Sequence, residues 1–149
     1  MTELARSFQG GSGRKGKWNK QVVYSVYEVP VQTGDTIIID RVSASDARAQ
    51  AINLALDKGN LRANGVLMGT AAVWTHTSPT TCQLEVVGRK ARSIDVWNGW
   101  SFEGVESAWL GQSAMVVEEN GTEYTFRCSD GLGEPTFDDL VFELRIDHG

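Results

Sequence analysis

The fold is decided by the stretch Ala114-Met115-Val116-Val117-Glu118-Glu119-Asn120-Gly121-Thr122-Glu123-Tyr124-Thr125-Phe126-Arg127-Cys128. Asn and Gly adopt positive φ at little cost, and the tight turn of a two-residue hairpin requires positive φ. On either side, Met115-Val116-Val117 and Tyr124-Thr125-Phe126 consist largely of the β-branched and aromatic residues that favour strands. We therefore predict a β-hairpin that turns at Asn120-Gly121, and with it an antiparallel sheet.

With the two strands of this hairpin, 108–118 and 122–128, similar runs predict about eight strands in all. The further runs cover residues 21–29, 36–42, 65–75, 82–87, 91–97 and 140–146. The first two runs are expected to pair with each other across Thr33-Gly34-Asp35. A second Asn-Gly dipeptide, Asn98-Gly99, predicts another hairpin turn between Trp97 and Trp100. In the last strand, alternating apolar residues predict one buried face.

One segment has the features of a helix. Ser43 and Asp46 resemble a capping box, residues 47–56 are rich in good helix formers, and Lys58-Gly59 supplies a typical stop. The predicted fold class is therefore α+β and β-rich. It comprises an antiparallel sheet or sandwich of about eight strands, with one helix at about 44–58 packed on it.

Length and composition predict a single globular domain behind an arm. The chain has 149 residues, of which 41% are apolar and 22% charged. We expect residues 1–20 to form a flexible, basic, Gly-rich arm and residues 21–149 to form one β-rich domain. No apolar run approaches a membrane span, and Met1 to Arg6 lacks the apolar core of a signal peptide. We expect synthesis in the cytoplasm, with incorporation into a virion as one destination.

Charge is divided unevenly along the chain. Residues 1–20 carry five cations and one carboxylate, whereas residues 103–149 carry eleven carboxylates and two cations. This division predicts either that the two ends meet different partners, or that the basic arm lies over the acidic end of its own or a neighbouring subunit. A solvated acidic face with a loose tail is the alternative.

The arm matches the letters of nucleotide-binding patterns but lacks the residues and flanking elements that such a site needs. Residues 11–17 read G-x-x-x-x-G-K, but Trp18 stands where a phosphate loop needs Ser or Thr, and the flanking strand and helix are missing. Direct nucleic-acid binding is not expected either. His76 has no companion nucleophile or metal ligand in the sequence, and His148 is expected to lie in a frayed end. We predict no catalytic residues, no enzymatic activity and no cofactor.

The spacing of cysteines and carboxylates shows which residues could form a metal site. Cys82 and Cys128 fit no zinc pattern and are expected to be buried thiols, with a disulfide as the alternative. The weak calcium candidates are Asp130, Glu134, Asp138 and Asp139. The ending from Phe137 to Phe142 resembles the closing strand of some extracellular calcium-dependent β-sandwich domains. A solvated acidic turn is the preferred interpretation, so we predict no metal site.

The residues expected to bind a partner are basic or aromatic, with internal packing across the hairpin as the alternative for the last two: Arg14, Lys15, Lys17, Trp18, Trp97 and Trp100. With no catalytic set, they favour a non-enzymatic structural or assembly subunit that contacts other protein subunits as a homo-oligomer. The expected class is a virion accessory or capsid decoration-type protein. The alternatives are an acidic inhibitor that mimics nucleic acid, and a calcium-dependent glycan-binding module.

Overall fold

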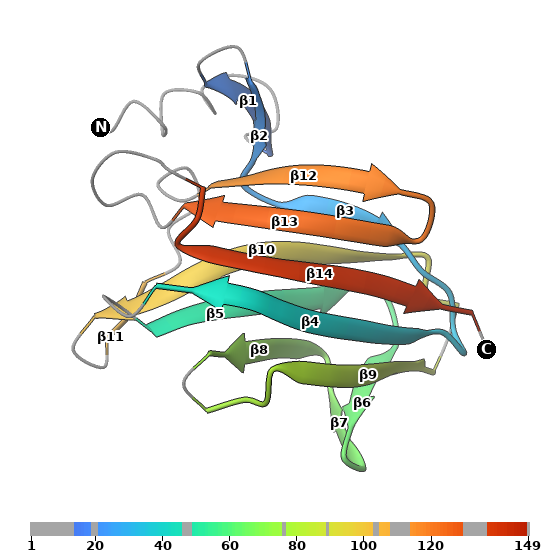
Figure 1. Cartoon of the computed structure of the whole chain (residues 1–149). Coiled ribbons are helices and arrows are strands. Elements are labelled where there is room, and N and C mark those ends of the chain that lie inside the picture. The colour runs from blue at the N-terminus through green and yellow to red at the C-terminus, as the bar shows by residue number, and fades with distance from the viewer. Residues whose placement is uncertain are drawn as a thin grey trace.

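The computed structural model describes residues 14–18, 21–45, 49–75, 77–88, 90–102, 105–107, 114–129 and 137–148. These residues form two antiparallel β-sheets that pack face to face (Figure 1). The strands are β1 (Lys15–Trp18), β2 (Gln21–Tyr24), β3 (Tyr27–Pro30), β4 (Thr36–Ala44), β5 (Ala49–Leu56), β6 (Asn60–Ala63), β7 (Val66–Met68), β8 (Thr70–Trp74), β9 (Thr81–Val87), β10 (Ser93–Phe102), β11 (Val105–Ser107), β12 (Ala114–Asn120), β13 (Glu123–Ser129) and β14 (Leu140–Asp147).

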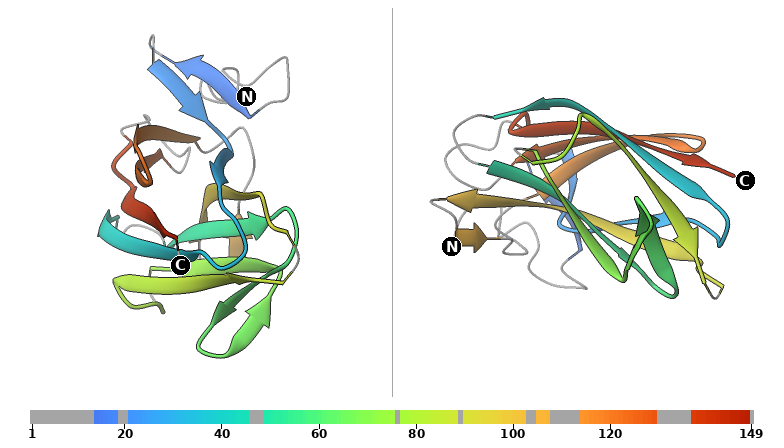
Figure 2. Two further views of the ribbon diagram at one scale, coloured as in Figure 1. Left: turned by 90° about the vertical axis from the view of Figure 1, so that its right-hand side faces the viewer. Right: turned by 90° about the horizontal axis from the view of Figure 1, so that it is seen from below.

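The two sheets differ in size. The larger sheet has nine strands in the order β1-β2-β12-β13-β14-β4-β9-β6-β7. The smaller sheet has five, ordered β11-β10-β5-β8, with β3 also paired to β10. Figure 2 shows the two layers edge-on, with the β1–β2 hairpin extending beyond the sandwich. In the described part of the chain, no helix is long and apolar enough to span a bilayer.

The predicted hairpin is confirmed, but its turn lies one residue later than predicted. Strands β12 and β13 pair from Ala114↔Ser129 to Asn120↔Glu123, so Gly121 and Thr122 form the loop and Asn120 ends β12. Gly121 has a φ of 66°. Strand β14 continues the sheet beside β13. The predicted alternation in β14 is also present, because Phe142 and Leu144 are buried while Glu143 between them is exposed. This three-stranded unit is the centre of the larger sheet.

The predicted helix at 44–58 is wrong, because the described residues of that segment belong to strands β4 and β5. Strand β5 lies between β10 and β8, and residues 50–54 are buried one after another. A strand covered on both faces carries a continuous apolar run, and such a run cannot be told from a buried helix by its periodicity. Pairing with two neighbours therefore overrides the helix propensity of Ala, Gln and Leu. The fold is all-β in its described residues.

Two predicted hairpins are also corrected. Asn98-Gly99 lies inside the continuous strand β10, so Trp97 and Trp100 are three positions apart on one strand instead of facing each other. Asn98 is buried, and its Nδ2 donates to the carbonyl of Ser129 at 3.1 Å, a contact between the two sheets. Residues 21–30 divide into β2 and β3, and β3 pairs with β10 while β4 lies in the larger sheet. The turn at 33–35 thus connects the two sheets.

The core between the sheets is aromatic at its centre. Phe126 and Phe142 stack with ring centroids 4.7 Å apart and an interplanar angle of 8°, and both are fully buried. From the smaller sheet, Tyr27 packs edge-on against Phe126 at 5.7 Å and against Tyr124 at 6.0 Å. Because these contacts join β3 to β13, they hold the two sheets together.

Replacing Phe142 by Ala should therefore reduce the free energy of unfolding by about 3–5 kcal/mol, since the change removes a buried ring and leaves a cavity. Urea unfolding measures the loss. Glu143→Gln, on the exposed face of the same strand, is the matched control and should change stability by less than about 0.5 kcal/mol. Equal effects of the two substitutions would contradict this description of the core.

Candidate partner-binding site

The basic hairpin, β1 with β2, is attached to both sheets. Tyr24 of β2 pairs with Met115 of β12, which places the hairpin at the edge of the larger sheet. At its base, the guanidinium of Arg14 donates two hydrogen bonds of 3.0 Å to the carboxylate of Asp95 in the smaller sheet. The amide of Ser25 donates to the carbonyl of Arg14 at 2.9 Å. The hydrogen-bonded carboxylate raises the pKa of Arg14. Arg14 is therefore an anchor of the hairpin.

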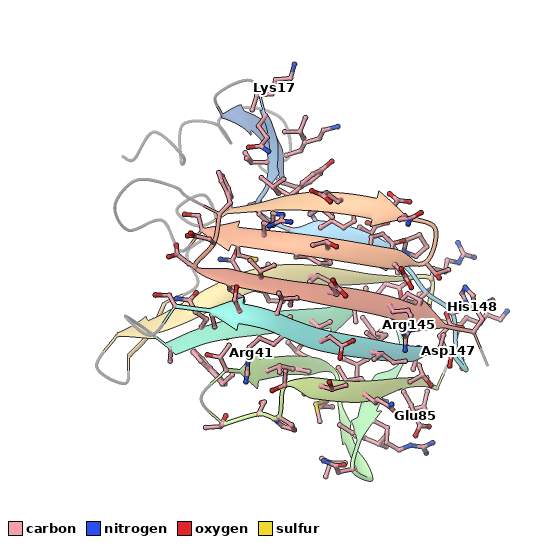
Figure 3. All side chains as sticks on the ribbon, viewed as in Figure 1. Lys17, Arg41, Glu85, Arg145, Asp147 and His148 are labelled. Carbon is pink, nitrogen blue, oxygen red and sulfur yellow. The ribbon has the colours of Figure 1, made fainter. Side chains whose placement is uncertain are left out.

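The lysines of the hairpin are exposed. Lys15 and Lys17 are two positions apart on β1, so they lie on the same face. Figure 3 shows Lys17 extending away from the sandwich. Trp18 ends β1 opposite Gln21. Of the predicted basic contacts, Arg14 is thus engaged within the chain, while Lys15 and Lys17 are presented to solvent.

The predicted aromatic site is not assembled as a pair. Trp97 lies opposite Asn53 of β5, is half-buried and packs against the main core. The backbone of Trp100 pairs with that of Gln50 on the same neighbouring strand. The structure therefore places Trp97 as a partly buried side chain of the smaller sheet, packed against the core. Its role in partner binding stays a prediction.

Carboxylates gather on the outer face of the larger sheet. Register places Glu118, Glu143 and Asp40 in one row across β12, β13, β14 and β4, with Thr125 between the first two. A shallow cavity of about 280 Å³ lies over this row and also touches Glu123. We call Asp40, Glu118, Glu123 and Glu143 the acidic face. Like charges opposite each other on neighbouring strands repel, so this surface favours a cationic partner.

A second cavity, of about 410 Å³, opens at one end of the sandwich, and we call it the open-end pocket. Three segments far apart in the sequence meet there: the end of β3 with its following turn, the β12–β13 turn, and the end of β14. Its apolar lining includes Val31, Tyr124 and Ile146, and its polar lining includes Glu119 and His148. Sequence reasoning missed this site, because no local pattern signals that these three segments converge.

A buried carboxylate supports one side of the open-end pocket. Asp35 is 2% exposed, and its Oδ2 accepts a 2.8 Å hydrogen bond from the amide of Gln32. Its Oδ1 lies 2.8 Å from Nδ1 of His148, whose side chain is 52% exposed. The expected frayed end at His148 is therefore corrected, because this contact ties the residue to the turn between β3 and β4.

On the opposite side of the pocket, Tyr27 orients Glu119. The Tyr27 hydroxyl donates to Oε2 of Glu119 at 3.0 Å. The pKa of Tyr27 is raised to about 12, mainly by burial of the phenol and to a smaller extent by this hydrogen bond. The ring of Tyr27 thus packs in the core while its hydroxyl positions a carboxylate at the rim. Neither residue was singled out by the sequence, since a Tyr in a strand usually indicates only packing.

The remaining candidates are distributed as follows. Cys128 is buried and Cys82 half-buried, both are free thiols, and burial raises the pKa of each. Asp138 is exposed, whereas the calcium candidates Asp130 and Glu134 lie outside the described residues, as does His76. Within the described residues, no group of three or more His, Cys, Asp or Glu side chains is arranged to hold a metal ion.

No known protein family, curated protein or solved structure matches this chain.

The raised pKa of Tyr27 predicts how stability depends on alkaline pH. Because the folded-state pKa of about 12 lies above the ordinary value of 10, the proton is held more tightly in the folded protein. The associated stability is complete below pH 10 and is lost as the pH rises from 10 towards 12. Urea midpoints at pH 8, 10 and 11 should fall less steeply for Tyr27→Phe than for the wild type. Parallel pH profiles for the two proteins would contradict the assignment.

Calcium should leave the protein unaffected. A site filled at a hundred times its dissociation constant would add about 2.7 kcal/mol to the free energy of unfolding. We expect millimolar calcium, compared with a chelator, to shift the melting temperature by less than about one degree. If calcium instead raised the melting temperature clearly, and Asp138→Asn abolished that rise, the result would support a calcium-dependent glycan-binding module.

Proposed function

We propose that this chain is a non-enzymatic structural subunit that assembles with other copies through its basic hairpin. The observation that carries the proposal is the position of that hairpin, which extends beyond the sandwich and presents Lys15 and Lys17 to solvent (Figure 2). Ordering such a segment costs free energy. A contact with a neighbouring molecule offsets this cost, and the projecting cations then bind carboxylates of that neighbour.

Charge complementarity supports a second copy as the partner. The hairpin is basic, whereas the acidic face carries several carboxylates and the rim of the open-end pocket carries the carboxylate of Glu119, and all belong to the same chain. Opposite charges on separate surfaces steer association and select the orientation of the partners.

The finer part of the proposal is that the assembled particle is a virion, in which this subunit is an accessory or decoration protein made in the cytoplasm of the infected cell. It is supported by the combination of a small β-sandwich, a basic N-terminal segment and exposed acidic strands. Such a subunit needs contact surfaces and no catalytic chemistry.

The acidic face favours one second candidate, an inhibitor that mimics nucleic acid. Glu118 and Glu143 lie in one row, as phosphate mimicry requires. However, Arg127 lies 3.8 Å from Glu118, and Arg145 shares the same face. These cations interrupt the negative surface, so we place this candidate second. It predicts a monomer that binds cationic proteins.

Removing residues 1–17 should separate assembly from folding. The anchor that is lost, Arg14 with Asp95, is a surface ion pair, and such pairs contribute about 0–1 kcal/mol. The truncated protein should therefore melt within a few degrees of the full chain but remain monomeric. Size-exclusion chromatography with light scattering measures the mass of each.

The double variant Lys15→Glu/Lys17→Glu tests the same point in the full-length chain and should also be monomeric. Its matched control is Lys58→Glu/Lys90→Glu, which changes the net charge equally at exposed lysines outside the hairpin and should assemble as the wild type does. A monomeric wild type, or a truncated protein that still assembles, would contradict the proposal.

A further inference from the structure

The open-end pocket has the chemistry of a site for a basic side chain. Its floor is apolar, since Val31, Tyr124 and Ile146 line it and each is at most 5% exposed. Its rim offers the carboxylate of Glu119 and the imidazole of His148. The side chains of Lys and Arg combine an apolar stem with a cationic head, and such stems lie along apolar surfaces while the head reaches a polar rim.

Asp35 determines which nitrogen of His148 faces the ligand. A carboxylate can only accept hydrogen bonds, so Nδ1 of His148, 2.8 Å from Asp35 Oδ1, must be the donor. In the neutral ring the other nitrogen, Nε2, then carries a lone pair. Glu119 likewise has one oxygen engaged by Tyr27, which leaves Oε1 as an acceptor. With the His148 ring neutral, the rim presents two oriented acceptors to a hydrogen-bond donor.

Lys17 of the same molecule cannot fill this pocket. The basic hairpin joins the larger sheet where Tyr24 meets Met115, near the start of β12, whereas Glu119 lies four residues further along that strand. Four residues of a strand span about 13 Å. The hairpin also extends away from the sandwich, and Figure 3 shows Lys17 at the top of the molecule and His148 well apart from it, at the right-hand edge. The occupant must come from elsewhere.

We infer that the open-end pocket of one copy receives the Lys17 side chain from the basic hairpin of a second copy. This inference rests on the proposed function and specifies its interface. Two different surfaces of the chain meet in such a contact. Two copies can make it reciprocally, as a two-fold dimer in which each hairpin enters the other copy's pocket, or successive copies can make it head to tail, which gives a ring or a filament.

Charge reversal tests the inference directly. The variants Lys17→Glu and Glu119→Lys should each weaken self-association by roughly tenfold to a hundredfold, because each places like charges in contact. An equimolar mixture of the two should regain the wild-type assembly, since every hairpin then finds a pocket of opposite charge. The chain with both substitutions should regain it as well. Sedimentation velocity over a range of protein concentrations measures all four samples.

Two controls separate the pocket from general electrostatics and from folding. Glu143→Lys reverses a charge on the acidic face, outside the open-end pocket, and should change association by less than about twofold. Glu119→Gln removes the charge while keeping a group that can accept from Tyr27, so it should stay folded and associate at an intermediate strength. Urea midpoints verify that each variant is folded.

The outcomes are distinct. If the wild type assembles but Glu119→Lys does so equally well, the inference is overturned while the proposed function stands, with the hairpin bound elsewhere. Failure of the folded chain with both substitutions to regain assembly also overturns it. A wild type that is monomeric at every concentration overturns the proposed function together with the inference.

Discussion

The packing of Tyr27 between the two sheets is the interaction on which the rest of the structure depends. Its ring meets Tyr124 and Phe126 of the larger sheet edge-on, in the geometry that aromatic quadrupoles favour. Its hydroxyl passes beyond the apolar core to Glu119. One side chain therefore joins the layers, satisfies its own polar group and orients a carboxylate at the surface. Through Glu119, the core is connected to the rim of the open-end pocket.

The same arrangement separates the charges of the molecule in space. Strand β12 carries the basic hairpin beside its first residues and Glu119 near its last. Because a strand is rigid and extended, the two surfaces are held apart and cannot neutralise each other within one copy. The basic hairpin and Glu119 thus lie beside opposite ends of β12. A molecule with complementary ends is suited to repeated head-to-tail contacts.

Hydrogen bonds at both ends of the sandwich reinforce the contact between the sheets. At the open end, His148 meets Asp35 in the turn that connects β3 of the smaller sheet to β4 of the larger. Towards the other end, Nδ2 of Asn98 donates to the carbonyl of Ser129, and Arg41 donates to the carbonyl of Thr75 at 3.0 Å (Figure 3). Buried polar groups that find partners in this way select one alignment of the sheets, whereas apolar packing alone tolerates small shifts.

Local chemistry made several features predictable from the sequence alone. The hairpin that turns at Gly121, the alternation along β14 and the unequal charge of the two chain ends follow from φ preferences, side-chain period and charge count, which need no knowledge of distant residues. Tertiary structure decided the remainder. Residues 49–56 form a strand because they pair with β10 on one edge and with β8 on the other. Asn98-Gly99 lies within a strand, where Nδ2 of Asn98 donates a hydrogen bond to Ser129 of β13. The open-end pocket forms where three segments that are distant in the sequence meet. Strand pairing between residues far apart in the chain brings Val31, Glu119 and His148 together.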